Sequence, residues 1–345
     1  MNRSMPQRLL HGLIQNPLLV ILIGMVLLVQ ATTGSQLSWG NLRGVLLDVA
    51  VIGIVAVPVA MLLIAGYIDL SVGSTLAIGG VCAALVVQNT GSMWLGVGAA
   101  ILVGALVGAV NGVLVAVVGL SSLITTLGVL TAGRGAAQLM SPLPVSGFSA
   151  DFAFLGAGAI AGVPVPAIIA GLLFILAGVY LVMTPTGRHI YAVGVNREAA
   201  YLSGISTKLI PLVLYVVAGG SAGLAGALTA ARLNSAPAGQ LGAGFELAVL
   251  TAVLIGGIAL TGGEGNMFGV LIGVLFMGLL SNSLTLLGVE TFWQNVVSGL
   301  ALVAAVIISL GTQRLRGRLL TLEAKKVAAP QALSSPGPAR TRPSP

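Results

Sequence analysis

The sequence predicts an all-α integral membrane protein, a polytopic bundle of about ten transmembrane helices that includes broken or re-entrant segments. The first observation is that 57% of its 345 residues are hydrophobic and only 7% are charged. A soluble domain carries about 25% charged residues, so a bilayer is the environment that fits this composition. The second is the abundance of glycine, 49 residues, which suits closely packed membrane helices. The third is a series of apolar runs, each long enough to approach or exceed the width of a bilayer.

The apolar runs define ten candidate spans that together make a permease-like domain over residues 17–311. Several are separated by only a few residues, and the pairs around Asp69 and Glu264 are candidates for broken or re-entrant helices. The candidate spans are 17–33, 45–66, 70–89, 94–118, 122–141, 165–183, 209–231, 245–262, 267–287 and 293–311.

The distribution of basic residues predicts the orientation. With ten spans, twelve of the fifteen Lys and Arg residues fall on one face, in residues 1–16, the loop 184–208 and the tail 312–345. The positive-inside rule then places both termini and this loop in the cytoplasm. We therefore expect a multi-pass protein of the bacterial inner membrane, with an uncleaved first helix and a disordered basic tail rich in Pro, Ala and Ser. The orientation of the chain in the membrane explains the net charge of +7, so this charge does not indicate nucleic-acid binding.

The loop 184–208 is the strongest candidate for function between the spans. Asn196 can cap a short helix, Glu198 lies in its first turn where the helix dipole favours an acid, and Gly204 stands where two turns would end. The loop is either a docking helix for a cytoplasmic partner or a solvated connector.

The stretch 66–80 places Asp69 at the junction of two apolar segments. An acid inside a membrane points to function, but Asp69 or Ser71 can also serve as an ordinary helix cap. These two roles are compatible, because a broken helix in a bundle can line a pathway.

Further candidates for a pathway or gate lie later in the chain. Glu246 begins an apolar helix, and the pair Gly256 and Gly257 can allow close packing or a kink. Asn111 and Asn282 are polar groups at bundle depth, for which hydrogen bonds between helices are the simplest explanation. Such groups would also suit a neutral polyhydroxylated solute.

Enzymatic and metal-binding classes find little support. The one cysteine, Cys82, lies in an apolar run, and the two histidines, His11 and His189, are far apart. No nucleotide-binding loop, catalytic triad or carboxylate pair is present. We expect no metal, no cofactor and no catalytic residue in this chain.

Several stretches together resemble one family, the ribose, xylose and autoinducer-2 branch of bacterial ABC importer permeases. The resemblance covers roughly residues 40–312, and it is carried by IDLSVGS at 68–74, GRHIYAVGVNREAAYLSGI at 187–205, FEL with TAVLIGG at 245–257, TGGEG at 261–265 and SNSLTLLGV at 281–289.

The resemblance implies a pore-forming subunit that imports a sugar or sugar-like solute of the ribose, xylose, rhamnose or autoinducer-2 class. It implies a cytoplasmic ATPase on a separate chain, a second permease subunit in a homodimer or heterodimer, and a periplasmic or lipid-anchored solute-binding protein. It also implies a coupling role for the loop helix, at Gly194, Asn196, Glu198, Ala199, Ala200 and Gly204. The alternative is a secondary transporter driven by an ion gradient, which would need ionisable groups inside the bundle.

Overall fold

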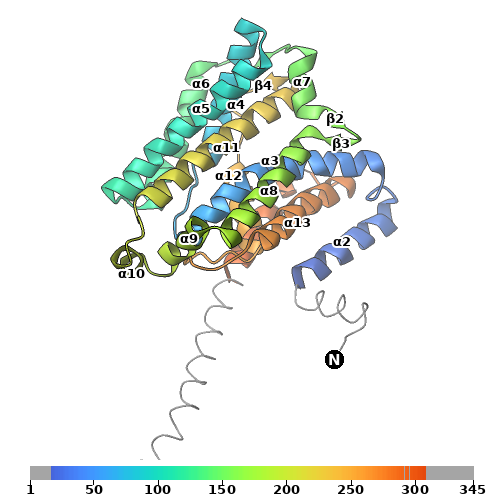
Figure 1. Ribbon diagram of the computed structural model, residues 1–345. Helices are drawn as coiled ribbons and strands as arrows, with labels where there is room; N and C mark the ends of the chain where they lie inside the picture. Colours follow the sequence, from blue (N-terminus) through green and yellow to red (C-terminus); the bar gives the residue numbers. More distant parts are fainter. Residues whose placement is uncertain (1–16, 291, 295, 308–345) are drawn as a thin grey trace, which may run out of the picture.

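The computed structural model describes residues 17–290, 292–294 and 296–307. The expected N-terminal segment 1–16, the basic tail 312–345 and the end of the last candidate span lie outside these residues. The described chain is mostly helical (Figure 1). Its elements are α2 (Pro17–Thr33), α3 (Trp39–Ile64), α4 (Val72–Thr90), α5 (Met93–Gly112), the π-helix η1 (Val113–Val118), α6 (Ser122–Met140), β1 (Val145–Ser146), α7 (Ala150–Ala157), β2 (Ala159–Ile160), β3 (Val163–Pro164), α8 (Val165–Met183), α9 (Pro185–Val195), α10 (Arg197–Leu202), α11 (Leu209–Leu233), β4 (Ser235–Ala236), α12 (Phe245–Ile255) and α13 (Met267–Leu286).

Six helical segments of the described chain are long and apolar enough to cross a membrane: α3, α4, α5 with η1, α8, α11 and α13. An apolar helix also covers residues 292–307. The expected total of ten spans is not confirmed. The clearest difference is the segment 245–262, where α12 has only 11 residues and ends at Ile255.

The glycine pair after α12 explains its early end. Gly257 has a φ of +87°, a left-handed conformation that glycine adopts without strain. Its N–H donates to the carbonyl of Leu254, and the N–H of Ile258 donates to Val253. This pair of bonds is the Schellman motif, which terminates a helix.

Small residues bring the central helices into backbone contact. Helix α11 packs against α3, α4 and α5, and its contacts with α4 and α5 have glycines on both sides. A Cβ added to Gly79 would lie 2.5 Å from the Cα of Gly223, and one added to Gly226 would lie 2.6 Å from the nitrogen of Gly80. Larger residues would force these helices apart, and such close backbone packing is one way in which helices associate in a membrane.

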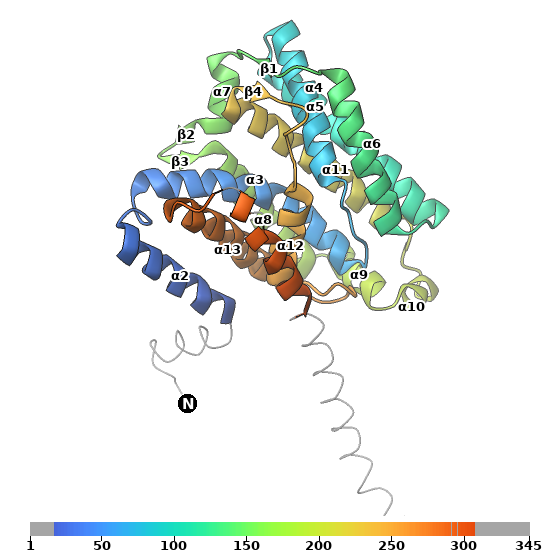
Figure 2. The same ribbon diagram turned by 180° about the vertical axis from the view of Figure 1, so that it is seen from behind.

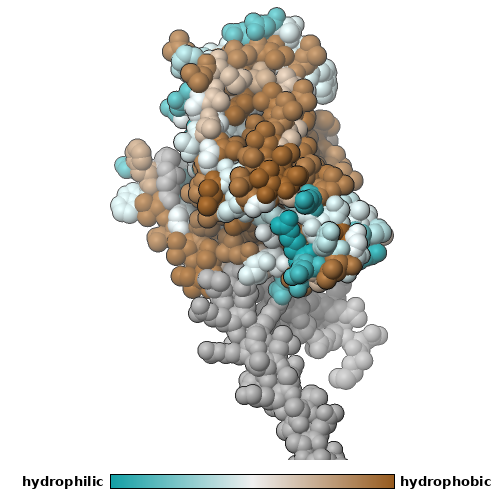
Figure 3. All heavy atoms as spheres, turned by 90° about the vertical axis from the view of Figure 1, so that its left-hand side faces the viewer, coloured by the Kyte–Doolittle hydropathy of each residue, from teal (hydrophilic) through white to brown (hydrophobic). Residues whose placement is uncertain are grey.

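The outer helices present an apolar surface instead. Leu102, Leu106 and Val110 recur at intervals of four residues on α5 and are all more than half exposed. Figure 3 shows the side of the molecule on which α5 and α6 lie in Figure 1 as a broad hydrophobic surface, with hydrophilic residues gathered above and below it. This distribution is what a lipid-facing surface requires.

The two ends of the bundle differ. Helices α9 and α10 lie at one end, which we call the α10 end, and the start of α2 and the last described residues point the same way (Figures 1 and 2). The opposite end carries α7 and two short antiparallel strand pairs, β1 with β4 and β2 with β3.

Two helices begin inside the bundle rather than at an end. In Figure 2, residues 65–71 run inward from the region of α9 to the start of α4, and the chain after β4 runs inward from the opposite end to α12. The two starts meet, since a Cβ added to Gly242 would overlap the carbonyl oxygen of Gly73, the second residue of α4. The predicted break at Asp69 therefore corresponds to a helix, α4, that starts within the bundle. The predicted break at Glu264 lies in the connection between α12 and α13, and the second interior start, at Phe245, was not predicted as a break. The membrane pathways of transporters are commonly built from helices that start within the bundle.

Candidate functional site

The loop 184–208 folds as two short helices that meet at Asn196. Asn196 ends α9 and caps α10, because its side-chain oxygen accepts a 2.9 Å hydrogen bond from the N–H of Ala199. Glu198 lies in the first turn of α10, as the sequence predicts. The carboxylate is favoured there by the free N–H groups of the helix start.

The end of α10 also follows the local prediction. Gly204 has a φ of +79°, its N–H donates to Tyr201, and the N–H of Ile205 donates to Ala200. This is a second Schellman motif. It stops the helix after six residues and returns the chain to the bundle.

The exposure of α10 is uneven. Ala200 is 4% exposed and faces the protein, whereas Tyr201 and Leu202 are 68% and 78% exposed. Glu198 and Ala199 are exposed beside them. A helix that presents large apolar and charged side chains outside the apolar surface of the bundle has the character of a protein-docking surface.

Gly194 fixes α9 to two other parts of the chain by backbone contact. A Cβ added at Gly194 would overlap the carbonyl oxygen of Ile64, the last residue of α3, and would lie 2.5 Å from the nitrogen of Gly263. The Gly263 nitrogen in turn donates a 2.7 Å hydrogen bond to the Ile64 oxygen. Gly262 completes the cluster, because a Cβ added there would lie 2.9 Å from the Cα of Gly66. We call Gly66, Gly194, Gly262 and Gly263 the glycine junction.

A side-chain contact supports the glycine junction. The hydroxyl of Tyr191 on α9 donates a 2.9 Å hydrogen bond to the carbonyl oxygen of Gly265. Burial raises the pKa of Tyr191, so the hydroxyl keeps its proton and remains a donor. The segment between α12 and α13 is therefore held to α9 by both backbone and side chain.

Sequence reasoning missed a second connection, which starts at Arg197. Its guanidinium carbon lies 6.0 Å from the centre of the Tyr67 ring, within the range of a cation–π contact. Tyr67 meets the ring of Tyr215 on α11 edge-on, at 6.4 Å, and the Tyr215 hydroxyl donates to the carbonyl oxygen of Ile68. The sequence shows Arg197 at the start of a predicted helix and Tyr67 directly after a glycine. No spacing rule relates two residues that lie so far apart in the chain.

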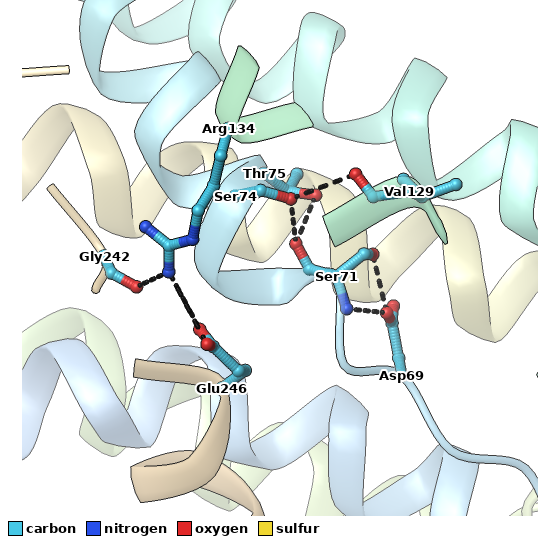
Figure 4. A network of polar contacts seen from close by, with 8 residues as sticks. All are labelled: Asp69, Ser71, Ser74, Thr75, Val129, Arg134, Gly242 and Glu246. Atoms are coloured by element: carbon cyan, nitrogen blue, oxygen red, sulfur yellow. Dashed lines mark hydrogen bonds and ion pairs between the residues drawn. The ribbon is translucent and has the colours of Figure 1, made fainter. Parts of the chain in front are cut away.

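The segment 65–71 holds the polar group that the sequence placed at Asp69. One Asp69 oxygen accepts bonds from the Ser71 N–H at 2.8 Å and from the Ser71 hydroxyl at 2.6 Å (Figure 4). The Asn111 amide on α5 donates to the same Ser71 hydroxyl at 2.7 Å. Asp69 thus organises the turn before α4, and Ser71 occupies the cap position without capping through its side chain. Among the described residues, the buried carboxylate is satisfied by Ser71 alone, and the predicted side-chain cap of α4 is not formed.

Glu246 lies in the first turn of α12 and is only 8% exposed. It pairs at 3.4 Å with Arg134 of α6, whose guanidinium also donates a 2.8 Å bond to the Gly242 carbonyl oxygen (Figure 4). The sequence had indicated Glu246 without indicating its partner. The pair joins α6 to the interior start of α12, next to the start of α4 at Gly73.

The remaining predicted site residues have structural partners. Asn282 on α13 and Asn41 on α3 exchange two amide hydrogen bonds, of 2.7 and 2.9 Å. Gly256 packs on the backbone of α13, where a Cβ would lie 2.7 Å from the Cα of Val270. Within the described residues, no three His, Cys, Asp or Glu side chains are grouped to hold a metal ion.

A comparison with known families identifies the broken-helix bundle. Residues 41–306 match the branched-chain amino acid transport system / permease component family. The chain belongs to this permease family. The match covers α3 to the last described helix, so the loop 184–208 and the interior helix starts are parts of the permease fold.

Individual relatives of this permease carry sugar-transport names. It is 37% identical over 301 residues to the ribose import permease protein RbsC of Escherichia coli K12, covering 86% of this chain and 94% of the relative. It is 38% identical over 270 residues to the L-arabinose ABC transporter permease protein AraH of Azospirillum brasilense, covering 77% and 79%. It is 39% identical over 249 residues to the D-allose transport system permease protein AlsC of Escherichia coli K12, covering 72% and 76%. No solved structure matches the chain. Similarity to these relatives supports a sugar ABC permease, which is a multi-pass transport subunit rather than an enzyme.

Proposed function

We propose that this chain is the permease subunit of an ATP-driven importer, and that it moves a sugar or sugar-like solute through the bundle while a separate chain hydrolyses ATP. The observation that carries the proposal is the contrast within the loop 184–208. Helix α10 exposes Tyr201 and Leu202, whereas α9 is packed without a gap onto α3 through Gly194. Helix α10 is suited to bind a partner protein, and α9 is suited to transmit the partner's motion to the bundle.

The contacts define a route for that motion. A displacement of α10 reaches the end of α3 and the segment before α13 through the glycine junction. It also reaches Tyr67 through Arg197, and so the segment 65–71 from which α4 begins. Both routes reach the segment 65–71, one through Gly66 and the other through Tyr67, and so the interior start of α4, where a change of position would open or close the pathway.

The relatives' names support the solute class. The solutes in these names are ribose, L-arabinose and D-allose, which are all neutral monosaccharides. We place the solute in the ribose, xylose, rhamnose or autoinducer-2 class. The partners in this proposal are the cytoplasmic ATPase, a second permease subunit and a solute-binding protein outside the membrane. The α10 end then faces the cytoplasm, together with both termini.

Variants of α10 test the coupling role. Glu198→Ala and Gly204→Val should abolish uptake of labelled sugar in cells that express the whole importer, while membrane insertion is retained. The matched control is Glu290→Ala, which removes an exposed acid in the connection that follows α13. Normal uptake by both α10 variants would contradict the coupling role.

The energy source needs a separate measurement. Uptake into vesicles should require internal ATP and should persist when a protonophore collapses the proton gradient. Uptake that follows the gradient and ignores ATP would support the secondary transporter instead.

A further inference from the structure

A pocket of about 400 Å³ opens between α3, α4, α11 and α13, and the segment at Gly242 and Phe245 forms part of its wall. Its polar side chains are Asp48, Thr229, Arg232 and Ser281, and most of its other wall is aliphatic. Solute sites in proteins have this size and this composition, with a few polar groups in an apolar wall.

The two charged residues of the pocket form an ion pair. The Arg232 guanidinium lies 2.6 Å from an Asp48 oxygen, and the two side chains keep 30% and 55% of their surface exposed. Asp48 lies roughly 13 Å along α3 from Trp39, at 1.5 Å per residue. Arg232 lies in the last turn of α11, so the pair lies toward the end of the bundle that carries α7. Charged groups there face water or the bundle interior, because lipid cannot solvate them.

The pocket adjoins the interior helix starts. Gly242 lines it, and the carbonyl oxygen of the same residue accepts the hydrogen bond from Arg134. Phe245, another wall residue, precedes Glu246, the partner of Arg134. A molecule in the pocket would therefore rest on the segment that the Arg134–Glu246 pair holds in place.

We propose that this pocket is a binding site for a neutral polyhydroxylated solute, in which Asp48 accepts hydrogen bonds from solute hydroxyls and Arg232 donates them. This inference rests on the proposed function and names a site on its pathway. The pair has no net charge, so it provides strong donors and acceptors without favouring an anion or a cation. Phe245 and the aliphatic wall receive the apolar faces of a sugar ring.

The single cysteine of the chain makes the pocket accessible to a direct test. In a Cys82→Ser background, Ser281→Cys places a thiol in the pocket, and Ser146→Cys places one on exposed β1 outside it. The purified importer is labelled with a membrane-impermeant thiol reagent, with ribose, L-arabinose or D-allose present in turn. We expect at least one sugar to slow labelling at position 281 about fivefold or more, and none to slow labelling at position 146. Protection by no sugar would overturn the site.

Variants of the pair identify the groups responsible. Asp48→Asn and the double variant Asp48→Asn/Arg232→Gln should both lose the protection at position 281, and Arg43→Gln should keep it. The double variant guards against misfolding caused by one unpaired charge. Unchanged protection in both pair variants, or equal protection by the aldonate of the same sugar, would overturn the proposal. Uptake by the Cys82→Ser importer is measured in parallel. If the importer takes up a sugar but that sugar does not slow labelling at position 281, the proposed site is wrong and the proposed function stands. If the importer takes up no sugar, both the site and the proposed function are wrong.

Discussion

Replacing Gly194 by alanine is the sharpest test of how α10 is connected to the bundle. Gly194 lies within α9, so alanine should stabilise the helix itself by up to about 1 kcal/mol. The added methyl group would nevertheless overlap the Ile64 oxygen and lie 2.5 Å from the Gly263 nitrogen. Cβ contacts below 3.0 Å are essentially never seen, so α9 must move at least 0.5 Å from Gly263 and further from Ile64.

The cost of this movement follows from the packing. Overpacking of a close contact costs about 1–3 kcal/mol, and the neighbouring atoms here are backbone that cannot change rotamer. A clash with backbone belongs in the upper part of that range, about 2–3 kcal/mol. Subtracting a gain of about 1 kcal/mol in helix propensity leaves the docked arrangement destabilised by about 1–2 kcal/mol. That reduces its population relative to competing arrangements by a factor of roughly 5 to 30.

The assay measures uptake and ATP hydrolysis by the same reconstituted importer. Gly194→Ala should lower the amount of sugar transported per ATP, while the protein still inserts and elutes as a single species in detergent. The control is Gly171→Ala on α8, where an added Cβ meets nothing within 4 Å. If Gly194→Ala transports sugar with the wild-type ratio, the glycine junction does not transmit the motion of α10.

Three further predictions concern separate contacts. Asn196→Ala should remove the cap of α10, cost about 0.5–2 kcal/mol of local stability, and speed amide exchange in α10 measured by mass spectrometry. Glu246→Gln should lower thermal stability by about 1–3 kcal/mol, because it leaves the partly buried Arg134 charge without its carboxylate, and Arg134→Gln/Glu246→Gln should recover much of the loss. Equal melting temperatures for all variants would refute a stabilising pair. Asn282→Leu should cost about 1–3 kcal/mol because the Asn41 amide loses both of its bonds to Asn282 and keeps only the one to the Gln36 carbonyl oxygen, whereas Asn41→Leu/Asn282→Leu should cost less in the same melting assay.

Local signals accounted for the parts of the site that could be predicted from sequence. Asn196 and Gly204 define α10 because a cap and a left-handed glycine act on residues three or four positions away. Glu246 marked the start of α12 for the same reason. The family motifs then gave the class of protein, which no local rule provides.

Long-range partners could not be predicted in this way. Asp48 pairs with Arg232, 184 positions later, although an acid inside the candidate span 45–66 was a signal that could have drawn attention to it. Arg197 meets Tyr67 only because α3 and α9 end at the same place. The expected total of ten spans is not confirmed for a related reason. Hydropathy does not show that α12 starts inside the bundle and ends before Gly257.

The shortness of α10 has a consequence for attempts to block it. Isolated helices below about 12–15 residues are marginal in water, and α10 has six. A free peptide copying residues 196–204 would be mostly unfolded, so it would compete poorly with the intact loop for a shared partner. Only a peptide cross-linked in its helical form should act as an inhibitor, because the two chain connections that hold α10 in the protein would be replaced by a covalent staple.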